Sequence, residues 1–227
     1  MNANEPAIVS YNQPREWFLW VLATMGGWLL GLLGNYASSI VLSMTGLGTT
    51  LETNPSQITP EIALFLMALS MGVLFIVGLA VGGLQWLVLR RHISGINRWA
   101  VFTGLGLVLG SIIMGAANQL APNGFSLAFL GVGVGLMQWL LLRRELNKAG
   151  WWLVISAVAW SLGYVFGGLI GAFAGDVLGS TLLGGLLGVA FTGAIIGAIT
   201  GAVLLWLLRE NAVLLDGLRE EAEQAKA

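Results

Sequence analysis

Long apolar stretches, separated by short segments of charged and turn-forming residues, make up most of the chain. Each stretch has about 18 residues or more and no charge at its centre, which is enough for a helix crossing a hydrocarbon core of about 30 Å. In lipid only helices and closed β-barrels satisfy their backbone hydrogen bonds, and these stretches are too long for barrel strands. The pattern predicts an all-α integral membrane protein. Its six expected transmembrane helices are 17–42, 62–89, 99–120, 125–142, 151–174 and 181–208.

Turn and capping residues mark several of the expected helix ends. The Asn-Pro-Ser sequence at 54–56 interrupts the loop after the first helix, and Asn-Gly at 123–124 is typical of a tight turn. Thr59, Pro60 and Glu61 have the pattern of an N-cap, a first-turn proline and an acid favoured by the helix dipole. This pattern is typical of a helix N-terminus, directly before the apolar stretch that starts at residue 62.

The cations lie at only one set of helix ends, and the opposite loops carry acids such as Glu52, Glu61 and Asp176. Lys and Arg are retained on the cytoplasmic side of short loops, so both chain termini are expected to be cytoplasmic. The outer acids are interpreted as caps and loop solvation rather than as a vestibule for cations. The ten cations are Arg15, Arg90, Arg91, Arg98, Arg143, Arg144, Lys148, Arg209, Arg219 and Lys226.

The chain divides into a lead, a membrane domain and a tail. Residues 1–14 are expected to form a disordered cytoplasmic lead. A signal peptide is the alternative, but acids precede the first helix and its apolar core is too long. Residues 15–209 form the membrane domain, as hairpins at about 15–91, 98–144 and 150–209. Residues 210–227 form an acidic cytoplasmic tail, whose leucine stripe is compatible with a short helix leaving the membrane.

An internal repeat is the most informative feature of the sequence. The segment 85–91, Gln-Trp-Leu-Val-Leu-Arg-Arg, returns 53 residues later at 138–144 as Gln-Trp-Leu-Leu-Leu-Arg-Arg. A third, divergent copy has Leu204 in place of the glutamine. In every copy two glycines lie 12 and 8 residues before an arginine, and a Trp is followed four residues later by a hydroxyl. The glycine pairs are Gly78 and Gly82, Gly131 and Gly135, and Gly197 and Gly201. The Trp and hydroxyl pairs are Trp20 and Thr24, Trp99 and Thr103, and Trp152 and Ser156.

Repeats that cross a membrane in the same sense are related by an axis along the bilayer normal. We therefore predict three hairpins of the same orientation in a pseudo-threefold bundle. The Gly-xxx-Gly faces are expected to hold the bundle together, because close van der Waals approach replaces the hydrophobic effect in lipid. Helical spacing places Gln85 and Gln138 on these glycine faces. It turns Trp86 and Trp139 away from them, as in an aromatic belt at the headgroups.

The repeated Gln-Trp-Leu-x-Leu-Arg-Arg motif is followed in both copies by a hairpin that starts with Trp, at Trp99 and at 151–152. This arrangement resembles a group of uncharacterised multi-pass membrane proteins of bacteria, frequent in cyanobacteria, that repeat a Gln-Trp-x-x-Leu-Arg signature. The resemblance covers residues 78–163 well and the flanking hairpins loosely. It implies a bacterial inner or thylakoid membrane, and it carries over no activity, substrate or catalytic residue.

The amino-acid composition excludes several classes of function. Hydrophobic residues make up 57% of the chain and charged residues 9%, which excludes nucleic-acid binding and disorder. There is no cysteine and only one histidine, His92, so zinc fingers and thiol catalysis are excluded and no metal site is expected. His92 is expected to be solvated in a polar loop rather than to act as a switch. The midplane carries no ionisable residue, which argues against an ion-coupled transporter and against an enzyme.

Two sets of residues remain as candidate sites. Gln85 and Gln138 are candidate cofactor ligands, for a cation or a chlorophyll magnesium, but interhelical hydrogen bonds are the favoured interpretation and no cofactor is expected. The second set is expected either to anchor the topology or to contact anionic lipid headgroups or an acidic partner. It consists of Arg90, Arg91, Arg143, Arg144, Trp86 and Trp139.

The sequence thus favours a non-enzymatic accessory or scaffold protein of a bacterial membrane that contacts lipids or a larger membrane complex. The glycine faces are equally compatible with pairing between chains, so an oligomer is among the expected forms. The alternative function is a passive channel or facilitator for a small solute, with the pseudo-threefold axis as its pathway.

Overall fold

The computed structural model describes residues 13–45, 59–93, 95–120 and 127–224, and within these ranges the chain is helical, without strands. Five of the helices are long and apolar enough to cross a membrane. The prediction of an α-helical, multi-pass membrane protein is therefore confirmed. In chain order the helices are α1 (Gln13–Met44), α3 (Pro60–Leu89), α4 (Trp99–Leu120), α5 (Leu127–Leu142), α6 (Trp151–Leu178) and α7 (Thr181–Gln224).

Helix α5 is the shortest of the described helices. It has 16 residues, which at 1.5 Å per residue span about 24 Å, less than a hydrocarbon core of about 30 Å. The expected span included residues 125 and 126, whereas the described helix begins at Leu127. Residues 121–126, with the expected Asn-Gly turn, lie outside the described residues, as does the Asn-Pro-Ser segment at 54–56.

The helix ends follow from local chemistry. The Thr59 side chain accepts a hydrogen bond from the backbone N–H of Ile62 at 3.4 Å, and Pro60 occupies the first turn, as predicted. Helix α6 ends at Gly179, whose φ of 60° lies in the left-handed region that glycine adopts without strain. The chain then turns directly into α7.

The first and last helices extend beyond the predicted limits of the membrane domain. Helix α1 begins at Gln13, inside the expected lead, and Pro14 is tolerated there because first-turn N–H groups need no helical partner. Helix α7 runs without interruption to Gln224, so the tail continues the last helix rather than forming a separate short one. Good helix formers such as Leu208, Arg209 and Ala212 carry the helix past the predicted end.

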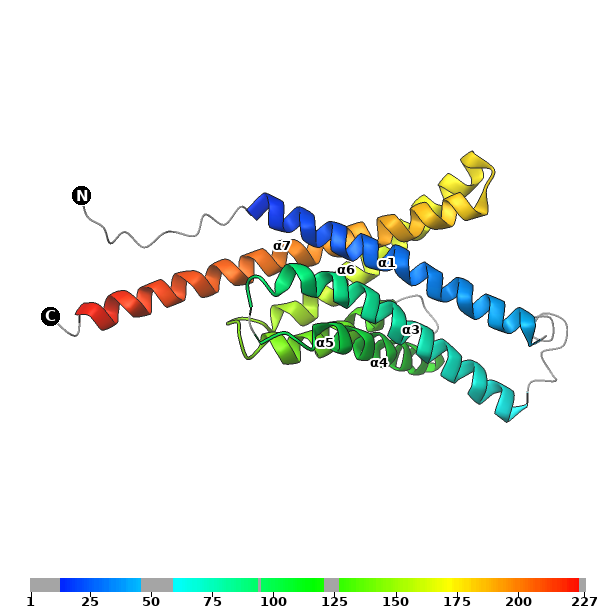
Figure 1. The fold of residues 1–227 in the computed structure, drawn as a ribbon, viewed down its shortest axis with the longest axis horizontal. Coiled ribbons are helices and arrows are strands. Elements are labelled where there is room, and N and C mark those ends of the chain that lie inside the picture. The colour runs from blue at the N-terminus through cyan, green and yellow to red at the C-terminus, as the bar shows by residue number, and fades with distance from the viewer. Residues whose placement is uncertain (1–12, 46–58, 94, 121–126, 225–227) are drawn as a thin grey trace.

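The helices close into a ring in sequence order. Each helix contacts the one before and the one after it, and α1 contacts α7, which completes the ring. The start of α1, the end of α7 and the α3–α4 and α5–α6 turns lie toward one end, and the α6–α7 turn lies at the other (Figure 1). We call the first of these the basic end, because its two turns carry Arg90, Arg91, Arg98, Arg143 and Arg144.

Glycines bring neighbouring helices into backbone contact. A Cβ atom added to Gly82 of α3 would lie 2.7 Å from the Thr103 Cβ of α4. A Cβ added to Gly135 of α5 would lie equally close to the Ser156 Cβ of α6. The same atom on Gly197 of α7 would lie 3.0 Å from the Thr24 Cβ of α1, which closes the ring. Such distances leave no room for a larger residue at these three contacts.

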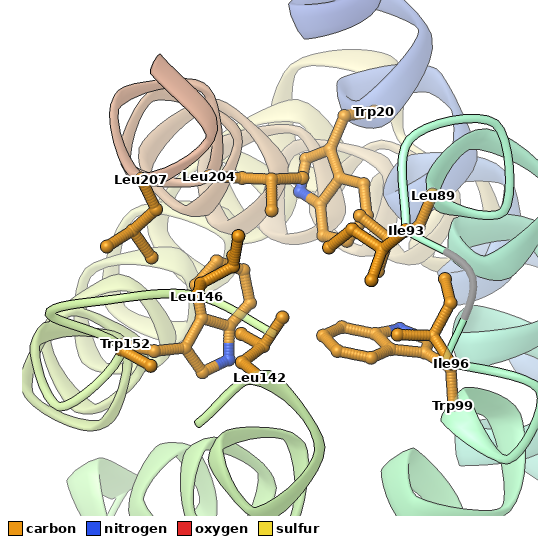
Figure 2. Close-up of a cluster of buried hydrophobic side chains, with 11 residues drawn as sticks. Trp20, Leu89, Ile93, Ile96, Trp99, Leu142, Leu146, Trp152, Leu204 and Leu207 are labelled. Atoms are coloured by element: carbon orange, nitrogen blue, oxygen red, sulfur yellow. The ribbon is translucent and has the colours of Figure 1, made fainter. Parts of the chain in front are cut away.

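Two apolar clusters fill the inside of the ring. The cluster at the basic end, drawn in Figure 2, is built on Trp20, Trp99 and Trp152 with surrounding Leu and Ile side chains. The second cluster includes Val81, Val134 and other side chains of α3, α4, α5, α6 and α7. Large apolar side chains are exposed on the outer surface, as expected for contact with lipid tails.

Candidate functional site

A buried polar network lies inside the ring, and Gln85 and Gln138 are its centre. Gln85 of α3 is 4% exposed. Its Oε1 accepts a hydrogen bond from the Trp99 indole N–H of α4 at 3.1 Å, and its Nε2 donates to the Thr24 hydroxyl of α1 at 3.1 Å. One glutamine therefore links three helices.

Gln138 of α5 repeats this arrangement. Its Oε1 accepts from the Trp152 indole N–H of α6 at 3.0 Å, and its Nε2 donates to the Thr103 hydroxyl of α4 at 2.9 Å. The same Nε2 lies 3.4 Å from the Oε1 of Gln85, which joins the two arrangements. Both amides thus have partners on neighbouring helices, and a buried amide in lipid is costly without them.

The third equivalent position differs. Trp20 of α1 donates its indole N–H to the Thr200 hydroxyl of α7 at 3.0 Å, one helical turn before Leu204, which replaces the glutamine in the sequence. Thr24, Thr103 and Thr200 each donate to the carbonyl oxygen four residues earlier. Because their protons are committed there, these hydroxyls offer lone pairs to the amide and indole donors.

Three tryptophans close the axis next to the network. The ring centroids of Trp20, Trp99 and Trp152 lie 6.0 to 6.2 Å apart, with interplanar angles of 67° to 78°. This edge-to-face geometry is favourable for aromatic rings. Figure 2 shows the three indoles contributed by three different helices among the surrounding leucines. These three indoles therefore fill the inside of the helix ring at the basic end.

Beside the network is a cavity of about 10 Å³. Its polar lining comes from Thr24, Gln85, Thr103, Gln138, Ser156 and Thr200, and the rest is aromatic and aliphatic. No charged side chain lines it among the described residues. The volume is at the lower limit of what holds one water molecule.

No family model, curated protein or solved structure matches this chain.

The second candidate site lies on the surface of the basic end. The Arg90 guanidinium lies over the Trp86 ring, 4.9 Å from its centroid, and Arg143 lies over Trp139 at the same distance. Both arginines are exposed, and so are Arg91 and Arg144. Within the described ranges no acidic side chain forms an ion pair with any of these four arginines.

Two expectations about this end need correction. Trp86 and Trp139 are not turned freely toward the headgroups, because both are partly buried against the cluster at the basic end and covered by an arginine. His92 is not simply solvated. Its Nε2 lies 3.2 Å from the Glu16 Oε2, and both side chains are largely buried where the α3–α4 turn meets α1.

The start of the tail is also held in place. Lys148, in the α5–α6 turn, forms an ion pair with Glu210 at 2.7 Å, and its ammonium lies 5.7 Å from the Trp206 ring centroid. Asn211 donates to the backbone carbonyl of Glu145 at 3.3 Å. The continuation of α7 is therefore fixed against the basic end at these residues.

The indole donors of Trp20, Trp99 and Trp152 were not predicted from the sequence as members of the site. A signal for them was present, because each repeated glutamine is followed 14 residues later by a Trp, at Trp99 and Trp152. The role of Thr200 had no such signal, since its position does not correspond to the glutamine of the other copies.

Proposed function

We propose that this chain is a non-enzymatic accessory or scaffold protein of a bacterial membrane, of the inner or thylakoid type. Its basic end faces the cytoplasm and contacts anionic lipid headgroups or an acidic part of a larger membrane complex. Six spans form three hairpins of the same orientation around a pseudo-threefold axis. Both termini are cytoplasmic.

The observation that carries the proposal is the contrast between the interior and the basic end. Inside the ring, the polar groups of Gln85 and Gln138 are engaged with one another and with neighbouring helices, and the three tryptophans fill the axis. At the basic end, four exposed arginines have no acidic partner among the described residues. The groups able to bind something therefore lie on the surface.

The stacked pairs of the basic end are suited to phosphate. A guanidinium over an indole face is held by cation–π attraction, while its edge keeps N–H donors for bidentate contact with an anion. Each cation near an anionic membrane surface contributes about 1 kcal/mol. Two such pairs in the same geometry, Arg90 with Trp86 and Arg143 with Trp139, support recognition of repeated phosphate groups.

Mass spectrometry of lipids that copurify with the full chain tests this proposal. We expect anionic lipids to be enriched over their share of the membrane, and the enrichment to disappear in the variant R90Q/R91Q/R143Q/R144Q. The matched variant R98Q/R209Q removes two exposed arginines with no described contact to a tryptophan ring, and it should keep most of the enrichment. Equal lipid retention by the wild type and the quadruple variant would contradict the headgroup contact.

A pigment-binding role remains a narrower version of the accessory function. Amide carbonyls are able to coordinate a chlorophyll magnesium, but those of Gln85 and Gln138 accept indole N–H groups and face a cavity of about 10 Å³. A pigment role predicts absorbance that copurifies with the protein and is lost in Q85L/Q138L. A colourless preparation from a photosynthetic membrane would eliminate it.

The second candidate function is a passive pathway for a small solute along the axis. The ring of helices and its polar inner groups favour it, whereas the contacts among Trp20, Trp99 and Trp152 would have to open. Solute-dependent swelling of proteoliposomes that exceeds the swelling of empty vesicles would support a pathway. Equal rates in both would exclude it for the solutes tried.

A further inference from the structure

One buried hydroxyl differs from its counterparts in the other helix pairs. Gln85 of α3 donates a hydrogen bond to the Thr24 hydroxyl of α1, and Gln138 of α5 donates one to the Thr103 hydroxyl of α4. In α6 and α7 the corresponding hydroxyl is Ser156, which is 1% exposed and has no hydrogen-bond partner among the described residues. A buried hydroxyl without a partner costs about 1–3 kcal/mol, so a missing partner is expected.

The amide that would donate to Ser156 is missing because Leu204 occupies the position of the glutamine. The pair α6 and α7 has the register of α1 and α3, because a Cβ on Gly163 would meet Ile196 as one on Gly31 would meet Val77. In this register, position 204 of α7 lies opposite Ser156 of α6 in the same way that Gln85 of α3 lies opposite Thr24 of α1. Leucine cannot donate, and the hydroxyl of Ser156 is left facing the cavity that it helps to line.

A second polar group in the same cavity also has no partner. Trp28 of α1 lines the cavity, and its indole Nε1 is buried without a hydrogen-bond partner in the part of the chain that the structure describes. The ring itself is fixed between aromatic neighbours, with centroids 5.3 Å from Trp160 and 5.6 Å from Tyr164. The two residues that carry these unpaired groups, Trp28 and Ser156, therefore both line a cavity of about 10 Å³.

We propose that this cavity is a binding site for a single water molecule, which takes the place of the third glutamine amide. The water accepts the Trp28 indole N–H and bonds with the Ser156 hydroxyl, and Thr200 also lines the site with a lone pair to offer. Two to four polar partners are what a buried water requires. This site is independent of the proposed role of the basic end.

The lining distinguishes water from an ion. An indole N–H only donates, so it disfavours a cation at this point. Among the described residues no lysine, arginine or histidine lines the cavity, so an anion would be buried in the membrane without a countercharge. Water both donates and accepts, and the volume excludes larger solutes.

A crystal structure of the full chain, at a resolution that shows surface waters, tests the site directly. We expect one density peak within hydrogen-bond distance of both Trp28 Nε1 and Ser156 Oγ, and its loss in L204Q, where the new amide reaches Ser156. A map with ordered surface waters but without this peak would overturn the proposal. So would a peak with the short ligand distances of a metal ion.

Thermal unfolding in detergent gives a second test that needs no crystals. Leu204 and Leu207 both lie buried on α7 in the cluster at the basic end. We expect L204Q to keep or raise the unfolding temperature, because its amide satisfies Ser156, and the matched variant L207Q to lower it by several degrees. In L204Q/S156A the benefit should be lost. The outcome against this arrangement is an unfolding temperature of L204Q as low as that of L207Q, with the same value in L204Q/S156A. An amide at position 204 would then have no partner in Ser156.

Discussion

At the scale of single residues, the interior depends on a few polar side chains, each with a specific partner. Gln85 and Gln138 are typical, since each accepts an indole N–H and donates to a threonine hydroxyl on another helix. The surrounding hydrocarbon offers no hydrogen-bonding group to replace a lost partner. Removing one amide therefore affects three helices at once.

The variant Q85L should destabilise the fold by about 1–3 kcal/mol, because it leaves the Trp99 indole N–H without its acceptor. Denaturant or thermal unfolding in detergent measures the change. The matched control is Q119L, in which an exposed glutamine near the far end of α4 is replaced and little change is expected. Equal effects of Q85L and Q119L would mean that the buried bonds contribute nothing.

The two glutamines should also be coupled, because Gln138 Nε2 lies 3.4 Å from Gln85 Oε1. In a double-mutant cycle, Q85L/Q138L should cost less than the sum of the single variants, by about 0.5 kcal/mol or more. Strict additivity would show that the two halves of the network act independently.

Residue-level prediction from the sequence succeeded where the chemistry is local. The cap at Thr59 and Pro60 was predictable because it involves neighbouring residues. The partners of Gln85 were not, because Thr24 and Trp99 come from other helices and depend on how those helices are rotated. His92 shows the same limit, since its contact with Glu16 joins residues 76 positions apart.

At the scale of helices, contact is decided by which face carries glycine. Adjacent glycines on α3 illustrate this, because a Cβ on Gly82 would press on Thr103, whereas one on Gly83 would meet nothing within 4 Å. The sequence indicated the helices and most of their ends. It did not fix the extension of α7, where no proline interrupts the helix after the predicted end at residue 208.

The pair G82A and G83A tests the helix contact with the same chemical change at adjacent positions. G82A should lower stability by about 1–3 kcal/mol, because α3 and α4 must move apart. G83A should be neutral or stabilising, since alanine favours the helix by up to about 1 kcal/mol. Unfolding in detergent compares them, and a G82A protein as stable as G83A would refute the close contact.

At the scale of the whole molecule, the arrangement separates a sealed interior from a charged end. The start of α1, the end of α7 and the arginine-bearing turns lie toward one end, away from the α6–α7 turn (Figure 1). The distribution of basic residues predicts that this end is cytoplasmic. The role proposed for the four arginines depends on that orientation.

Single-cysteine labelling tests the orientation, because the chain has no native cysteine. G150C places a thiol in the α5–α6 turn, and D176C places one beside the α6–α7 turn, both at exposed positions. A membrane-impermeant maleimide should label G150C in inverted vesicles and D176C in right-side-out vesicles. The opposite pattern, or labelling of both from one side, would contradict the topology.

The accessory role itself is tested most directly by purifying the tagged wild-type protein from its native membrane in mild detergent. Mass spectrometry then identifies the proteins, lipids and pigments that copurify, with R90Q/R91Q/R143Q/R144Q as the comparison. We expect a stoichiometric membrane partner or a specific set of anionic lipids that is lost with the four arginines. A protein that copurifies with neither, in wild type and variant alike, would contradict the account and favour the solute pathway.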